Sequence, residues 1–166
     1  MATTKLGDND VQTAGDLPTV GAPAPSFTLT GADLSEVTSA SLAGTNVVLN
    51  IFPSIDTGVC ATSVRTFNER AAGLEGTRVV CVSADLPFAL GRFCGAEGIE
   101  NVSTTSTFRS PEFGEDYGVL MTDGRLHGLL ARAVVVIGGD GVVRHVELVP
   151  SIGQEPDYDA ALAAIG

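Results

Sequence analysis

Residues 45–84 read TNVVLNIFPSIDTGVCATSVRTFNERAAGLEGTRVVCVSA, and this stretch decides the fold. Its two ends, residues 45–52 and 78–84, are nearly continuous apolar runs, which are typical of strands buried on both faces. Between them, apolar residues recur at steps of four and three from Cys60 to Leu74, which predicts the buried face of a helix. Two buried strands joined by a helix indicate a parallel β-α-β unit.

The patterns on either side of this unit extend it to an α/β domain. Five further elements are expected: a helix over 86–94, a short strand over 101–107, an antiparallel hairpin of 131–137 with 142–149, a final helix over 155–165, and a small extra hairpin over 4–13. Asp85 should cap the 86–94 helix and Gly95 should end it. This order predicts a thioredoxin-like fold with a short N-terminal β-hairpin extension, in a single domain over residues 1–166.

Composition narrows the class of protein. Apolar residues make up 44% of the 166 residues, which allows a sizeable core. The net charge of −11 argues against nucleic acid as a partner, because phosphate binding needs clustered Lys and Arg. The N-terminal residues lack the apolar stretch of a signal peptide, and no run approaches the roughly 18 apolar residues of a membrane span. We therefore expect a cytoplasmic protein that does not associate with membranes.

Cys60 is the candidate reactive residue, because it falls in the first turn of the helix that is expected to start near Val59. Thr57 is a plausible N-cap, which makes Cys60 the third helical residue, and the Thr57 hydroxyl is expected to accept the backbone N–H of Cys60. First-turn N–H groups have no helical partners and the helix dipole is positive there, so both favour a thiolate over a thiol. The alternative is that Cys60 is a small packing residue on the apolar face of the helix.

Motifs along most of the chain resemble one enzyme family. Pro53, Thr57 and Cys60 spell P-x-x-x-T-x-x-C, which resembles the peroxidatic motif of the peroxiredoxins. The longer string NIFPSIDTGVCATSVRTFNERA is similar to the thiol peroxidase subfamily, the atypical two-cysteine peroxiredoxins. DLPFALGRFCGAEG resembles the helix that carries the resolving cysteine of that subfamily, which is Cys94 here. LLARAVVVI resembles the segment that carries its catalytic arginine, which is Arg132 here. The resemblance implies the peroxiredoxin variant of the thioredoxin-like fold.

The same resemblance implies a reaction and a partner. Cys60 would attack hydrogen peroxide or an organic hydroperoxide and become a sulfenic acid, which Cys94 would convert into a Cys60–Cys94 disulfide. Thioredoxin would reduce that disulfide. Arg132 would favour the thiolate and hold the peroxide oxygens, Thr57 would orient sulfur and substrate, and Pro53 would exclude water. The family commonly forms homodimers, and we expect neither a cofactor nor a metal.

Other cysteine chemistries fit the sequence less well. A cysteine hydrolase needs a Cys–His pair, and His127 and His145 are the only histidines. A dithiol exchanger needs C-x-x-C, whereas residue 57 is Thr; the three cysteines also lack zinc-site spacing. A glutathione-peroxidase-like enzyme is expected to have an active-site tryptophan, and the chain has none.

Cys81 lies within the 78–84 strand and is expected to be a packing residue with apolar neighbours. The non-enzymatic alternative is a redox sensor that signals through oxidised Cys60.

Overall fold

The structure of the protein, a computed structural model, describes residues 1–165, so Gly166, the last residue of the predicted domain, lies outside the description. The strands are β1 (Thr3–Leu6), β2 (Asn9–Gln12), β3 (Thr28–Gly31), β4 (Glu36–Thr38), β5 (Asn46–Ile51), β6 (Thr77–Ser83), β7 (Ser103–Ser106), β8 (Ala133–Ile137) and β9 (Val143–Leu148). The helices are α1 (Gly58–Ala71), α2 (Pro87–Glu97), α3 (Glu112–Asp116), α4 (Tyr158–Ala163) and a short 3-10 turn over Ala40–Leu42.

Seven strands form the main sheet, in the order β4-β3-β7-β6-β5-β8-β9. Strand β6 runs parallel to β5, and α1 connects the two, which confirms the predicted β-α-β unit. Strands β8 and β9 pair antiparallel, which confirms the predicted hairpin. Strand β8 also pairs antiparallel with β5, with Ala133 opposite Ile51. The end of β5 and the start of β8 therefore meet at one edge of the sheet, where the reactive cysteine is expected.

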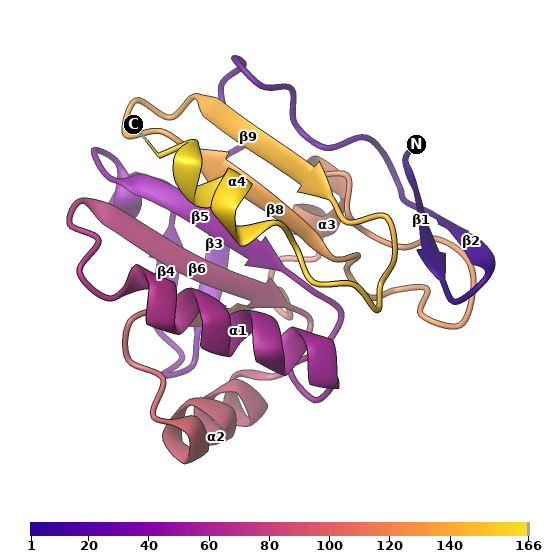
Figure 1. Ribbon diagram of the computed structural model, residues 1–166, viewed down its shortest axis with the longest axis horizontal. Helices are drawn as coiled ribbons and strands as arrows, with labels where there is room; N and C mark the ends of the chain where they lie inside the picture. The colour runs from indigo at the N-terminus through magenta and orange to yellow at the C-terminus, as the bar shows by residue number, and fades with distance from the viewer. Residues whose placement is uncertain (166) are drawn as a thin grey trace.

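Both faces of the sheet are covered, as the continuous apolar runs predicted. Alternate residues of a strand point to opposite faces. Along β5, Val47, Leu49 and Ile51 belong to one buried cluster, whereas Val48 belongs to a second cluster that also contains residues of α1, α2 and α4. In Figure 1, α1 and α4 lie in front of the sheet, and α3 lies behind it. Helix α1 thus packs, together with α2 and α4, on the face of the sheet that Val48 lines.

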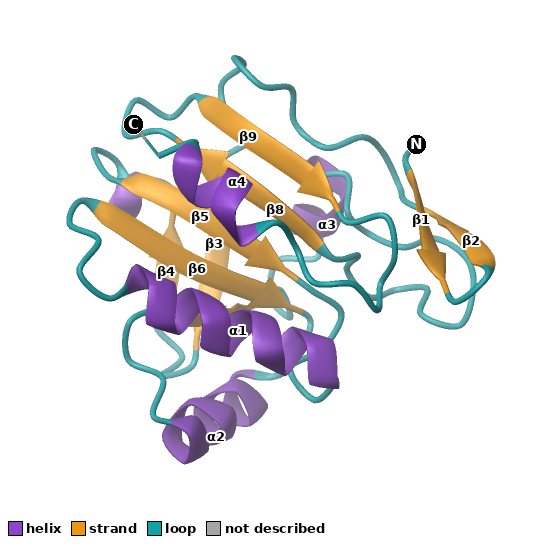
Figure 2. Cartoon of the chain, viewed as in Figure 1, coloured by secondary structure: helices purple, strands orange, loops and turns teal. Residues whose placement is uncertain are grey.

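The predicted N-terminal hairpin is present and forms a separate two-stranded sheet of β1 and β2 (Figure 2). It is attached to the segment after β9: the Thr4 hydroxyl donates to Val149 O at 2.8 Å, and Ile152 N donates to Lys5 O at 2.8 Å. Hydrogen bonds to backbone groups fix the path of a loop that has no secondary structure of its own. The hairpin therefore positions the backbone around Ile152, which contacts the site described below.

Several boundaries differ from the sequence prediction. Helix α2 continues past Gly95 to Glu97 and ends at Gly98, which has a left-handed φ of 64°. The prediction that Asp85 caps α2 is wrong: Leu86 is the N-cap residue, and the Asp85 carboxylate binds other groups. Strands β3 and β4 and helix α3 were not predicted, because they are only three to five residues long and show no clear apolar period.

Candidate active site

The turn between β5 and α1 brings the P-x-x-x-T-x-x-C residues together at the edge of the sheet. Pro53 is buried at its start, and Thr57 is the N-cap residue of α1, so Cys60 is the third helical residue, as predicted. The predicted capping bond is wrong, however. The Thr57 hydroxyl is turned back into the turn and donates to Ser54 O at 3.1 Å, so it does not accept the N–H of Cys60. The first-turn N–H groups of α1 thus have no capping side chain.

Cys60 and Arg132 meet although 72 positions separate them. Cys60 is fully buried, and Nη2 of Arg132 donates to its Sγ at 3.1 Å. Arg132 directly precedes β8, and the antiparallel pairing of β8 with β5 brings it to the edge of the sheet from which α1 starts. A guanidinium at hydrogen-bond distance stabilises an anionic sulfur more than a neutral one. The contact therefore places a fixed positive charge and an N–H donor directly against the sulfur of Cys60.

The guanidinium of Arg132 is itself buried, with only 1% of the residue exposed. Its Nε donates to Ile152 O at 2.8 Å, whereas its Nη1 has no hydrogen-bond partner within residues 1–165. None of the ion pairs among these residues involves Arg132. A buried cation is costly unless an anion or several hydrogen bonds accompany it. The site therefore combines a cation, a sulfur and one unused N–H donor group, which suits an anionic or oxygen-containing ligand.

Cys94 lies on α2, away from Cys60. Its side chain is half-buried, and its Sγ is 3.3 Å from the hydroxyl of Thr104 on β7. All three cysteines are free, so the predicted Cys60–Cys94 disulfide is not formed here. The Cys94 carbonyl accepts the N–H groups of Gly98 and Ile99 at the end of the helix. Cys94 is thus one turn inside α2, and not at its end as the sequence suggested.

Cys81 is buried in the middle of β6, as predicted, with 1% of the residue exposed. Burial raises the pKa of its thiol from 9.0 to about 12. The expectation of purely apolar neighbours is wrong, because Asn50 and Thr104 flank it on the adjacent strands and Asn50 Nδ2 lies 3.7 Å from its sulfur. Asn50 Nδ2 also donates to Ser63 Oγ at 3.1 Å. Cys81 therefore borders a buried polar group beneath α1.

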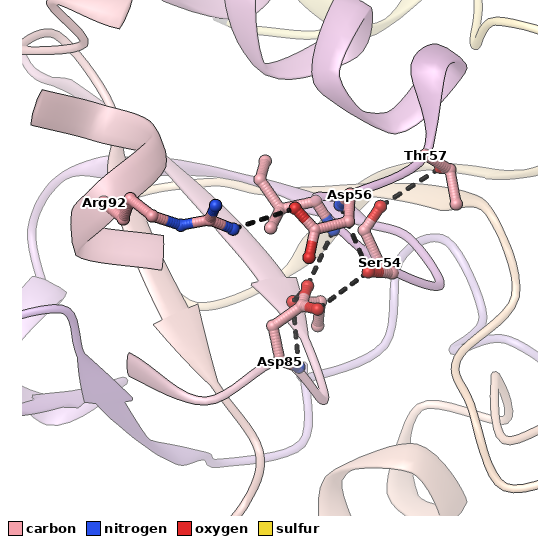
Figure 3. Close-up of polar contacts among 7 residues, drawn as sticks. Ser54, Asp56, Thr57, Asp85 and Arg92 are labelled. Carbon is pink, nitrogen blue, oxygen red and sulfur yellow. Dashed lines mark hydrogen bonds and ion pairs between the residues drawn. The ribbon is translucent and has the colours of Figure 1, made fainter. Parts of the chain in front are cut away.

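Two polar side chains around the site, those of Ser63 and Asp85, make contacts that were not anticipated from the sequence. Ser63 Oγ donates to Cys60 O at 2.7 Å, within the first turns of α1. The Asp85 carboxylate accepts from Ile55 N at 2.7 Å and from Ser54 Oγ at 2.8 Å (Figure 3). One signal was available for Asp85: it follows a buried parallel strand, and the carboxyl ends of parallel strands meet at one edge of a sheet.

Comparison with known proteins gives a consistent result. The Redoxin family model matches residues 19–162. The thiol peroxidase of Mycobacterium tuberculosis is 63% identical over 166 residues, which cover 100% of this chain and 99% of that protein. The thiol peroxidase of Corynebacterium glutamicum is 57% identical over 165 residues, with 99% of each chain covered. The chain belongs to the thiol peroxidase subfamily of the peroxiredoxins.

Solved structures agree with this peroxiredoxin fold. A peroxiredoxin-like protein from Aquifex aeolicus superposes with a TM-score of 0.93 at 42% identity, over 98% of this chain and 95% of that chain. The predicted fold class is thus confirmed, and the protein is a thiol-dependent peroxidase. Within the part of this thiol peroxidase that the structure describes, no helix has the length and apolar character needed to cross a bilayer.

Proposed function

We propose that this thiol peroxidase reduces hydrogen peroxide and organic hydroperoxides with Cys60 as the peroxidatic nucleophile. One observation carries the proposal: Arg132 Nη2 lies 3.1 Å from Cys60 Sγ, while Nη1 of the same buried guanidinium has no hydrogen-bond partner among residues 1–165. The first group stabilises the thiolate, and the second is available for a peroxide oxygen. Because both substrate classes share the O–O group, the donor serves both. Buried Pro53 keeps bulk water from the sulfur.

The first step is an attack of the Cys60 thiolate on one peroxide oxygen. A sulfur–oxygen bond forms, the O–O bond breaks, and the leaving oxygen takes up a proton as water or an alcohol. The sulfur is oxidised by two electrons to a sulfenic acid. Negative charge moves from sulfur to the leaving oxygen during this step, and Arg132 is placed to stabilise it at both ends. The Thr57 hydroxyl, which here contacts Ser54 O, would turn toward the substrate.

In the second step the Cys94 thiol attacks the sulfenic sulfur, which releases water and forms the Cys60–Cys94 disulfide. A disulfide requires Cα atoms within about 7 Å, and on this route the Cys94 sulfur exchanges its contact with the Thr104 hydroxyl for a bond to the Cys60 sulfur. Gly95 lies in the last turn of α2 and Gly98 is its C-cap residue, and glycine lowers the cost of unwinding a helix end. A dithiol protein then reduces the disulfide by exchange, and we propose thioredoxin in this role.

The coupled assay that tests this proposal follows NADPH consumption with thioredoxin, thioredoxin reductase and a hydroperoxide. Cys60→Ser is expected to abolish turnover, because an alcohol is not ionised at neutral pH. Cys94→Ser is expected to keep one fast reaction with peroxide and to lose thioredoxin-linked turnover, with oxidised Cys60 in the mass spectrum. Cys81→Ala is the matched cysteine control and should turn over normally.

Two outcomes contradict the proposal. Normal turnover of Cys94→Ser would remove Cys94 as the resolving residue. A wild-type protein that is oxidised once and then consumes no further peroxide would favour the redox-sensor alternative over an enzyme.

We also propose that the protein is a cytoplasmic homodimer. Leu86, Phe88 and Phe108 are large apolar side chains with 54%, 71% and 43% of their surface exposed, and a second copy is a candidate to cover them. Sedimentation of the wild type and of Phe88→Ser tests this point. A monomer at micromolar concentration in the wild type contradicts it.

A further inference from the structure

The carboxylate of Asp85 joins the end of β6 to the turn that carries the peroxidatic motif. Its Oδ2 accepts from Ile55 N at 2.7 Å and from Ser83 Oγ at 2.6 Å, and its Oδ1 accepts from Ser54 Oγ at 2.8 Å. Figure 3 shows Asp85 facing Ser54 across the gap between the two segments. Three donors therefore converge on one half-buried carboxylate, and two of them come from the turn between β5 and α1.

The same turn leads directly to the reactive sulfur. Ser54 O accepts both the N–H and the hydroxyl of Thr57, at 3.2 and 3.1 Å, and Thr57 is the N-cap residue of the helix that carries Cys60. A carboxylate that fixes Ser54 and Ile55 thus also fixes the start of α1. Hydrogen bonds to a charged group contribute more than neutral ones, so the contacts of Asp85 are the strongest set of polar contacts on the turn.

Asp85 also lies where the Cys60 turn and the Cys94 helix meet. Leu86, the next residue, is the N-cap of α2, and Arg92 on α2 pairs with Asp56 in the turn at 3.2 Å. The Arg92–Asp56 pair is exposed, and exposed ion pairs contribute little. The half-buried carboxylate of Asp85 is therefore the stronger of the two connections in Figure 3.

We propose that Asp85 is a positioning residue for Cys60, which holds the turn in the arrangement that reacts with peroxide and releases it when Cys60 moves toward Cys94. The inference rests on the proposed function of Cys60. Asp85 does not contact the sulfur, and it acts through Ser54, Ile55 and the helix start. Its loss should therefore slow the oxidation of Cys60 while leaving the later disulfide step at least as fast, because that step requires the turn to rearrange.

A positioning role and a charge effect of Asp85 predict opposite changes in the rate at which peroxide oxidises Cys60. Asp85→Asn removes a negative charge near the start of α1, which by Coulomb's law favours the Cys60 thiolate and speeds its reactions. The same substitution replaces one of the two carboxylate oxygens with an NH2 group that can only donate, so residue 85 can no longer accept hydrogen bonds at both ends. Positioning therefore predicts a slower reaction with peroxide, and electrostatics alone a faster one. Asp56→Asn is the matched control, since it removes one charge from the same turn without touching the Asp85 contacts.

The experiment measures two rates separately. Stopped-flow oxidation of reduced protein by hydrogen peroxide is expected to fall at least tenfold in Asp85→Asn and to stay within twofold in Asp56→Asn. The slower oxidation of Asp85→Asn should persist at alkaline pH, where ionisation of the Cys60 thiol no longer limits the rate. Formation of the disulfide from the oxidised protein should proceed at the wild-type rate or faster. Ser54→Ala, which removes one donor and keeps the carboxylate, should lose between twofold and tenfold, and it serves as the test if Asp85→Asn fails to fold.

The results separate failure of the inference from failure of the proposed function. If wild-type Cys60 is not oxidised by peroxide, the proposed function is wrong. If wild-type Cys60 reacts and both Asp85→Asn and Ser54→Ala react within twofold of it, only the positioning role is wrong. A parallel loss of oxidation and disulfide formation would mean that Asp85 supports the fold as a whole, which also overturns the inference.

Discussion

Replacement of Arg132 by lysine tests the geometry of the site more sharply than removal of its charge. Lysine keeps the positive charge but offers one ammonium where the guanidinium offers three nitrogens in a fixed plane. In the structure Nε binds Ile152 O at 2.8 Å, Nη2 binds Cys60 Sγ at 3.1 Å, and Nη1 has no partner in the described part of the chain, residues 1–165. A lysine whose ammonium keeps the contact with Cys60 Sγ therefore loses the bond to Ile152 O and the donor that Nη1 offers to the substrate.

The expected loss of rate follows from the hydrogen bond between Nη1 and the peroxide oxygen, which reaches its full strength only in the transition state. A hydrogen bond to a developing charge contributes roughly 1.5–3 kcal/mol, and about 1.4 kcal/mol corresponds to a tenfold change in rate. Arg132→Lys should thus lower the second-order rate constant for peroxide at least about tenfold. The unfolding free energy should fall by only about 1 kcal/mol, the net contribution of the bond to Ile152 O.

Stopped-flow oxidation by hydrogen peroxide is the assay, and alkylation by iodoacetamide is its companion. Alkylation depends on the thiolate and needs no donor for a peroxide oxygen, so it should fall much less than oxidation. Arg144→Lys, on an exposed arginine that pairs with Asp140, is the matched control and should leave both rates unchanged. Peroxide rates within a factor of two of wild type in Arg132→Lys would refute the assignment of Nη1 to the substrate. Equal losses in both assays would mean that Arg132 acts through the thiolate alone.

The remaining predictions concern stability and a second cysteine. Cys81→Ala should cost about 1 kcal/mol of unfolding free energy in urea titrations, and peptide mapping after peroxide treatment should find no disulfide to Cys81 in the wild type. Burial raises the pKa of the Cys81 thiol to about 12, so this thiol ionises in the unfolded chain at a lower pH than in the folded protein. The unfolding free energy should therefore fall as pH rises from about 9 to about 12, and Cys81→Ala should show a shallower fall. Gly118→Ala should cost at least about 2 kcal/mol, because φ is 67° and the new Cβ would lie 2.1 Å from Asp16 O. Gly7→Ala, with a φ of 62° and open space around it, should cost less in the same thermal melts.

The sequence predicted the parts of the fold that depend on local patterns. The runs over 45–52 and 78–84 and the period from Cys60 onward correspond to β5, β6 and α1, and the predicted hairpin of 131–137 with 142–149 corresponds to β8 and β9. Each of these elements buries an apolar face, so its period is visible in the residues themselves. The short strands β3 and β4 lack such a period, since they are held by pairing with each other and with β7.

Helix caps were less predictable, because a polar side chain can form hydrogen bonds either with local or with distant partners. Asp85 precedes α2 and has the residue type of a helix cap, yet its carboxylate binds the turn next to β5. Thr57 occupies the N-cap position, but its hydroxyl donates backward to Ser54 O. Gly95 and Gly98 both resemble helix ends, and only the second adopts the left-handed conformation that ends α2.

The sequence by itself determined that a cysteine sits in the first turn of a helix after a buried strand, because both features are encoded within about fifteen neighbouring residues. Only the tertiary structure decided what surrounds that cysteine. The pairing of Ile51 with Ala133 brings Arg132 to Cys60, and the parallel pairing of β5 with β6 brings Asp85 to Ser54. Contacts between elements this far apart depend on strand order and register, which arise from packing of the whole chain and leave no local period in the sequence.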